Sequence, residues 1–153
     1  MLKFLPLILI FTLFISSPNS KSDFEYIGAS KCKMCHNKPP KGAQYKKWSE
    51  GRPHANAMKS LKGDEINDTK CLKCHSTASS IVNDGVSCES CHGPGSVYKS
   101  MSIMKNKTKA LENGLLEPVE QVCKKCHNEE SPNFKGFDFK EYSAKIAHPD
   151  PSK

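Results

Sequence analysis

All eight cysteines of this 153-residue chain fall into four pairs of the same form. Each pair has two residues between its cysteines, and a histidine directly follows the second cysteine. The four motifs are Cys32–His36, Cys71–His75, Cys88–His92 and Cys123–His127. Because the whole chain has only six histidines, chance does not explain four of them in these positions. Any fold for this chain must therefore accommodate four copies of one binding motif.

Cys-x-x-Cys-His is the attachment signature of a c-type haem. Two thiols one helical turn apart can add to the two vinyl groups of the porphyrin, and the next histidine can bind the iron. We therefore predict four covalently bound haem c groups. The thiols that hold them are Cys32, Cys35, Cys71, Cys74, Cys88, Cys91, Cys123 and Cys126. The predicted proximal iron ligands are His36, His75, His92 and His127.

Zinc and disulfides are the other common uses of paired cysteines. The spacing within each pair suits structural zinc, and Cys74 and Cys88 are separated by about the interval of a zinc ribbon. Zinc does not, however, require a histidine after every pair. Disulfides form in exported proteins, but Cys-x-x-Cys loops are strained and mostly catalytic. The repeated histidine therefore favours haem over both alternatives.

The chain is poor in large aliphatic residues and rich in lysine, serine and asparagine, with 37% hydrophobic residues in all. Such a composition buries too little apolar surface to offset chain entropy. We therefore predict that the haems form the core of a mainly α fold with long loops and minimal β structure, and that folding depends on haem attachment. Short helices are predicted over 44–50, 53–62, 97–112, 118–127 and 138–147.

The first 22 residues have the pattern of a signal peptide. Lys3 precedes an apolar run over 4–15, and Ser20 and Ser22 supply small residues for cleavage after Ser22. The apolar run is too short to span a bilayer comfortably. We expect a signal peptide over 1–22 and a tetrahaem cytochrome c domain over 23–153. The product would be exported to the periplasm, or further to the cell surface or medium, with an uncleaved anchor as the alternative.

Only His54 and His148 lie outside the motifs. Pro53 can begin a helix that carries His54, and Asp138 with Glu141 can form a capping box for a helix that ends at His148. Both histidines are predicted distal iron ligands, although each could instead be a surface or packing residue. They would complete the ligand sets of two haems and leave two haems without a second histidine.

Met101 and Met104 are further candidates for distal iron ligands. They follow the third motif and would raise the reduction potential of a haem that they bind. Their spacing of three residues also suits one face of a helix, so packing in the core is the alternative. An iron that lacks a distal ligand would remain open to small molecules.

The formal net charge is +7, and Arg52 is the single arginine. Proteins that bind nucleic acids commonly use arginine for bidentate contacts, so a nucleic-acid partner is not expected. The lysines either steer an acidic redox partner or offset the charge of the haem propionates. The sequence leaves both roles open.

Four segments follow one another as in the cytochrome c-554/c-prime-like multihaem cytochromes, which this chain resembles over residues 26–148. They read YIGASKCKMCH, WSEGRPHANA, CLKCHSTA and GVSCESCHGPGS. The resemblance implies a mainly helical fold, closely stacked haems and electron relay outside the cytoplasm. It also implies extra histidines as distal ligands, and His54, which is followed directly by Ala55, matches one of these by that His-Ala pair. Family members often carry a histidine just after the GPGS segment, where this chain has Tyr98.

These features favour an exported tetrahaem electron carrier over an enzyme. The expected partners are redox proteins, and a membrane-bound quinol-linked cytochrome is one candidate. Two alternatives remain open. An open haem could make the chain an enzyme or a binder of NO, nitrite, hydroxylamine or peroxide. The chain could also be a subunit of a haem-stacked assembly in which one subunit donates a ligand to another, so that the protein would be an oligomer.

Overall fold

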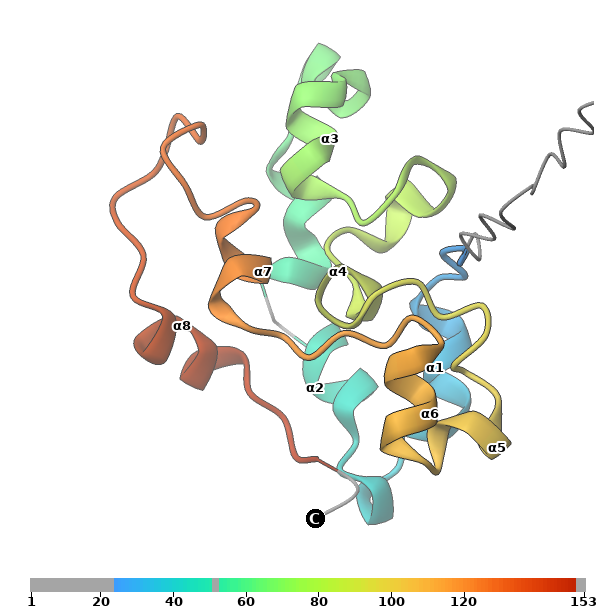
Figure 1. Cartoon of the computed structure of the whole chain (residues 1–153). Coiled ribbons are helices and arrows are strands. Elements are labelled where there is room, and N and C mark those ends of the chain that lie inside the picture. The colour runs from blue at the N-terminus through green and yellow to red at the C-terminus, as the bar shows by residue number, and fades with distance from the viewer. Residues whose placement is uncertain (1–23, 51–52, 151–153) are drawn as a thin grey trace, which may run out of the picture.

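The computed structural model describes residues 24–50 and 53–150 (Figure 1). The predicted signal peptide, its cleavage site and Arg52 lie outside the described residues. The described chain forms short helices joined by long loops, without a β-strand, so the predicted mainly α fold class is confirmed. The α-helices are α1 (Ala29–His36), α2 (Gln44–Ser49), α3 (Thr69–His75), α4 (Cys88–His92), α5 (Met101–Met104), α6 (Lys107–Glu112), α7 (Glu120–Lys124) and α8 (Phe139–Ile146). The 3₁₀ helices are η1 (Pro39–Lys41), η2 (His54–Ser60), η3 (Gly63–Asn67) and η4 (Ser79–Asp84).

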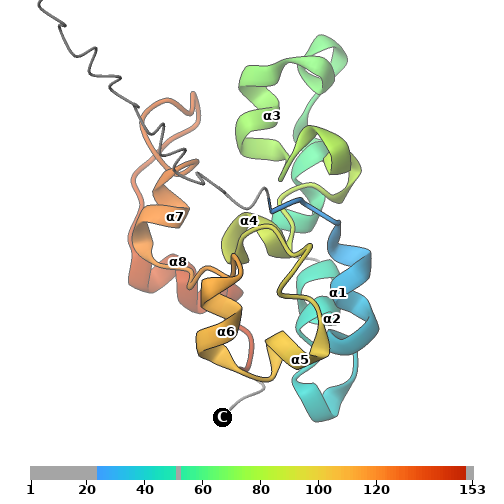
Figure 2. The ribbon, with the colours of Figure 1, turned by 45° about the vertical axis from the view of Figure 1, so that its right-hand side comes forward.

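The helix α4 lies at the centre of the arrangement (Figures 1 and 2). The helix α1 is on one side of it, and α7 and α8 are on the other. The helix α3 lies at one end of the molecule, and α2, α5 and α6 lie toward the opposite end. In the part of the chain that the structure describes, no helix has the length and apolar character needed to cross a bilayer.

Each motif begins in a helix. The first and second motifs end α1 and α3, and the third motif forms the whole of α4. The fourth motif starts in α7, but this helix ends at Lys124, so Cys126 and His127 follow it in a turn. Since residues three apart lie on one face of a helix, the two thiols of each helical motif are presented on the same side.

The helices predicted over 97–112 and 53–62 differ most from those observed, and α7 covers only part of the helix predicted over 118–127. The predicted helix over 97–112 is divided into α5 and α6, because the Asn106 side chain accepts a hydrogen bond from the Lys109 N–H at 3.0 Å and caps a new helix there. The segment predicted as a helix over 53–62 contains the 3₁₀ turn η2 instead.

The cap of the last helix at Asp138 is confirmed, because its side chain accepts a hydrogen bond from the Glu141 N–H at 2.7 Å. The predicted capping box is only half formed, because the Glu141 carboxylate pairs with Lys145 Nζ at 2.5 Å instead. The helix ends earlier than predicted, at Ile146. A residue that precedes proline favours extended backbone, so Pro149 disfavours a helical His148. His148 therefore lies in the chain beyond α8 rather than in its last turn.

The side chains alone form a very small core. Among residues 24–50 and 53–150, the buried hydrophobic residues are Ala29, Tyr98 and Ala110, and the largest fully buried side chain is that of Glu89. A folded domain of ordinary size buries most of the surface that its unfolded chain exposes. The scarcity of buried apolar side chains agrees with the expectation that a bound group completes the core.

Replacement of Tyr98 by phenylalanine is expected to destabilise the protein by about 1–2 kcal/mol. The buried Tyr98 hydroxyl donates to the Gly93 carbonyl oxygen at 2.7 Å, and the variant would leave that buried acceptor unpaired. Denaturant unfolding of the haem-loaded protein measures the change. Tyr26→Phe is the matched control, because Tyr26 is 40% exposed and its replacement should have little effect. Equal stability of the Tyr98→Phe variant and the native protein would contradict the expectation.

Candidate haem sites

The thiols of different motifs lie against one another. Cys32 of the first motif lies close enough to Cys88 of the third for the two thiols to interact. Cys126 of the fourth motif is likewise close to Cys74 of the second. Cys91, in the third motif, is close enough to Cys123 in the fourth for their charges to interact. The motifs therefore follow one another in space in the order second, fourth, third, first.

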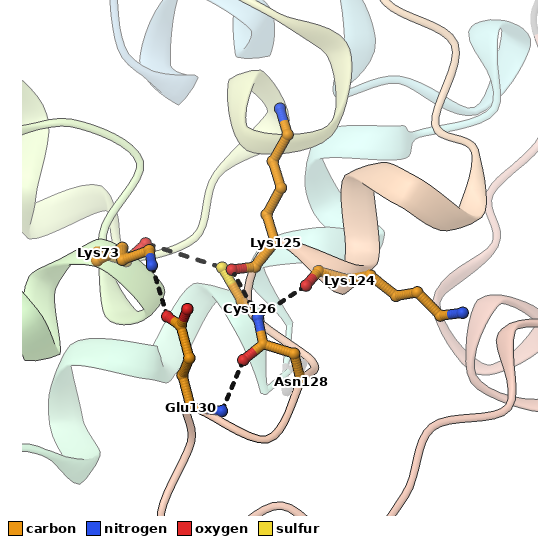
Figure 3. A network of polar contacts seen from close by, with 6 residues as sticks. All are labelled: Lys73, Lys124, Lys125, Cys126, Asn128 and Glu130. Atoms are coloured by element: carbon orange, nitrogen blue, oxygen red, sulfur yellow. Dashed lines mark hydrogen bonds and ion pairs between the residues drawn. The ribbon is translucent and has the colours of Figure 1, made fainter.

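A polar network fixes the contact between the second and fourth motifs (Figure 3). Lys73 Nζ lies 2.6 Å from Glu130 Oε2, and the Lys73 carbonyl oxygen accepts a weak hydrogen bond from Cys126 Sγ at 3.7 Å. Asn128 holds the chain between these groups, because its amide donates to the Lys124 carbonyl at 2.8 Å and its oxygen accepts from the Glu130 N–H at 2.8 Å. The ion pair is exposed and adds little stability, but it fixes which side of α3 faces the fourth motif.

The second and third motifs are also connected directly. Thr77 follows the second motif, and its hydroxyl is 2.7 Å from the Ser90 hydroxyl inside the third motif. The same oxygen accepts a hydrogen bond from the Ser87 N–H at 2.8 Å. Thr77 therefore joins the two motifs that are closest in the sequence, although the thiols of the second motif face the fourth.

Three motif histidines have Nδ1 directed at a carbonyl oxygen. His75 Nδ1 lies 2.9 Å from the Ala57 carbonyl, and His92 Nδ1 lies 3.4 Å from that of Leu116. His36 Nδ1 lies 3.3 Å from the amide oxygen Oε1 of Gln44. A carbonyl oxygen can only accept, so Nδ1 carries the proton in these rings. The lone pair of Nε2 is then available to a metal, as is usual for metal-binding histidines.

Two pairs of histidine rings lie close to each other, one pair edge-on at an interplanar angle of 70° and the other tilted at 42°. The ring centroids of His54 and His127 are 6.0 Å apart, and those of His92 and His148 are 5.8 Å apart. Imidazole nitrogens bind metal ions at about 2 Å, so two rings on opposite sides of one ion have centroids about 6 Å apart. The structure therefore brings both predicted distal histidines to motifs, His54 to the fourth and His148 to the third.

Burial lowers the pKa of His54 and of His92, and the facing histidine of each pair lowers it further. Burial also lowers the pKa of His127. Each shift favours the neutral imidazole, which is the form that binds a metal ion. His127 is held in addition by Phe137, whose ring stacks on it at a centroid distance of 4.8 Å.

Gln44 was not singled out by the sequence, yet it links two of these sites. Its side chain is buried, its Oε1 faces His36, and its Nε2 donates to the Pro149 carbonyl at 2.9 Å. Pro149 follows His148 directly, so this hydrogen bond holds the C-terminal segment in place against α2. Nothing in the sequence near Gln44 indicates the contact, because Gln44 and Pro149 lie far apart along the chain.

His36 and His75 have no ring contact with a second histidine in the described part of the chain, and both spare histidines face other motifs. Met101 and Met104 lie on α5, where the Met101 side chain is 62% exposed and Met104 is half-buried. Their assignment as distal ligands remains a prediction.

The residues present fit covalent haem at the four motifs. Each motif supplies two thiols and a histidine, and two motifs also have a facing histidine. A cavity of about 240 Å³ adjoins the fourth motif and is lined in part by Cys126, His127, Phe134 and Tyr142. Within the described ranges, no three His, Cys, Asp or Glu side chains gather as ligands of a metal ion bound by protein alone.

The sequence was compared with known proteins. Residues 31–93 match the family described as cytochrome c554 and c-prime, a stretch that holds the first three motifs. A cytochrome c-554 of Nitrosomonas europaea is 28% identical over 166 aligned positions, which cover 83% of this chain and 68% of that protein. No solved structure matches the chain.

Proposed function

We propose, from the confirmed resemblance of this chain to the c-554-like cytochromes, that it is an exported tetrahaem cytochrome relaying electrons between redox proteins. The matches support a c-type cytochrome that binds haem covalently, carries electrons and has redox proteins as partners. The proposal also includes finer parts: four haems, a signal peptide over 1–22, a mature domain over 23–153, and a periplasmic or cell-surface location.

The spatial order of the motifs carries this proposal. The thiol contacts connect the second motif to the fourth, the fourth to the third, and the third to the first, without a break. Haem supplies reversible one-electron chemistry when it is bound. The chain holds its four attachment points next to one another, which suits a relay that passes electrons from one haem to the next.

The ligand assignment follows from the facing rings. His36, His75, His92 and His127 are the proposed proximal ligands. We assign His148 as the distal ligand at the third motif and His54 as the distal ligand at the fourth. His54 and His92 are largely buried, and His92 is also held by the contact of its Nδ1 with the Leu116 carbonyl. Met101 and Met104 remain candidates for the first motif, because α5 and the second motif lie toward opposite ends of the molecule.

The end of the molecule that carries the first motif is strongly basic. Residues 29–50 contain six exposed lysines: Lys31, Lys33, Lys38, Lys41, Lys46 and Lys47. The same segment has one acidic residue, Glu50, which lies 3.8 Å from Lys46. Residues 62–84, around the second motif, have three lysines and four acidic residues. This difference favours an acidic redox protein at the α1–α2 end, where opposite charges would accelerate the encounter.

Stopped-flow electron transfer tests the relay. The haem-loaded protein is mixed with a reduced acidic flavodoxin, and a second acceptor is added to collect the electrons. We expect the rate of reduction to fall as the salt concentration rises. We also expect a lower rate after Lys31→Glu and Lys33→Glu are combined, whereas the control Lys140→Glu, on α8, should have little effect. Equal rates in all variants, or no transfer to the second acceptor, would refute the relay with this entry point.

Ligand binding at an open iron is the second candidate function, and the absence of a facing histidine at His36 and His75 in the described chain favours it. A chain with this function would bind NO, nitrite, hydroxylamine or peroxide, as an enzyme or as a sensor. Carbon monoxide added to the reduced protein distinguishes the two candidates. A changed absorption spectrum indicates an open iron, and an unchanged spectrum indicates a closed carrier in which methionine or another subunit completes the ligand sets.

A further inference from the structure

The third motif contains a buried carboxylate. Glu89 lies between Cys88 and Cys91, and its side chain is 1% exposed. Its Oε1 accepts hydrogen bonds from the N–H of Gly95 at 2.7 Å and of Ile27 at 3.1 Å. Its Oε2 accepts from the N–H of Gly28 at 2.8 Å and again of Ile27 at 3.1 Å. Three backbone N–H groups from two distant segments therefore converge on one side chain.

Hydrogen bonds that backbone N–H groups donate to a carboxylate are shorter and stronger than those between neutral groups. Burial of a charge is costly unless the charge is paired or strongly hydrogen-bonded. Among the residues that the structure describes, no lysine or histidine forms an ion pair with Glu89, so only backbone dipoles compensate its charge. A negative charge is thus fixed inside the protein, where water screens it weakly.

The charge lies where the first and third motifs meet. Gly28 directly precedes α1, the helix that carries the first motif. Cys32 of that helix lies close to Cys88, and Glu89 is near enough for its charge to act on both thiols. The backbone at Gly95 also lies close to the Glu89 carboxylate, because a Cβ atom added to Gly95 would lie 3.1 Å from Glu89 Oε1. The backbone of both segments therefore packs closely around this carboxylate.

We propose that Glu89 is a positioning residue with two separable effects on the haem pair of the first and third motifs. Its charge lowers the reduction potentials of these two haems, because a fixed negative charge stabilises the ferric form over the ferrous form. Its hydrogen bonds hold the start of α1 against the third motif and so fix how the two motifs approach each other. This inference rests on the proposed function, since it requires haem at both motifs.

Three variants separate the charge from the hydrogen bonds. Glu89→Gln removes the charge and nearly keeps the shape, whereas Glu89→Asp keeps the charge but is too short to reach all three N–H groups. Glu89→Met is a second neutral variant of different shape. Glu112→Gln is the matched control, because Glu112 is an exposed glutamate on α6.

Potentiometric titration of the haem-loaded proteins, followed by visible absorption, gives the midpoint of each haem. We expect two midpoints to rise in both neutral variants and two to remain unchanged. In Glu89→Asp we expect all midpoints to stay near those of the native protein, while the thermal unfolding temperature falls. In Glu112→Gln neither quantity should change.

Unchanged midpoints in the neutral variants would overturn the electrostatic effect, as would equal shifts in Glu89→Asp. An unchanged unfolding temperature in Glu89→Asp would overturn the positioning effect. If Glu89→Gln does not mature, Glu89→Met supplies the midpoints. Failure of the inference is distinguishable from failure of the proposed function, because a count of fewer than four haems in the native protein refutes the function without any variant.

Discussion

Without haem, the chain is expected to lose most of its helical structure. The buried apolar side chains of the described residues are Ala29, Tyr98 and Ala110, which cannot offset the entropy of ordering a chain of this length. The helices are also short, and α1 and α8, the longest, have eight residues each. Isolated helices of this length are unstable in water. Haem attachment must therefore supply the apolar contacts that keep the fold.

Far-UV circular dichroism measures this effect. The native sequence is produced without the haem attachment machinery and compared with the haem-loaded protein. A variant with all eight cysteines replaced by alanine serves as a control that separates loss of haem from reactions of free thiols. We expect both haem-free chains to give the spectrum of a largely unfolded protein. A compact haem-free chain with a native-like spectrum would show that the side chains suffice.

Removal of either facing histidine is expected to change the spin state of one haem per chain. His54→Ala would leave the haem of the fourth motif with one axial ligand, because His54 faces His127. His148→Ala would do the same at the third motif, because His148 faces His92. An iron with two histidine ligands is low-spin, and loss of one of these ligands favours the high-spin form.

Electron paramagnetic resonance of the ferric protein, with spins counted per chain, measures the change. Each single variant should convert one low-spin haem to high-spin, and the double variant should convert two. Phe137→Leu is a suitable control, since it removes the ring that stacks on His127 but no proposed iron ligand. Spin counts identical to those of the native protein would identify His54 and His148 as packing or surface residues.

The chemistry of the site was predictable from the sequence because it resides in local motifs. The spacing of cysteine and histidine within five residues indicates haem whatever the rest of the chain does. The confirmed cap at Asp138 is likewise local, since its partner Glu141 is three residues away. The division of the predicted helix over 97–112 had a local signal in Asn106, but a helical pattern on both sides concealed it.

The pairing of ligands was not predictable, because it depends on contacts between distant parts of the chain. The sequence identified His54 and His148 as spare histidines but did not indicate which motifs they face. The position of His148 depends in part on Gln44, whose side chain donates a hydrogen bond to the carbonyl of Pro149, the residue after His148. Glu89 was missed for a similar reason. A glutamate inside a helix resembles a surface residue until Ile27 and Gly28 pack over it.

Intact mass spectrometry of the mature protein under denaturing conditions tests the proposed haem content most directly. Covalent attachment predicts that four haems remain on each chain after unfolding, one for each Cys-x-x-Cys-His motif. Loss of the two cysteines of any one motif should then remove the mass of one haem. A native chain that carries fewer than four haems, or that releases haem on denaturation, would contradict the proposed tetrahaem cytochrome.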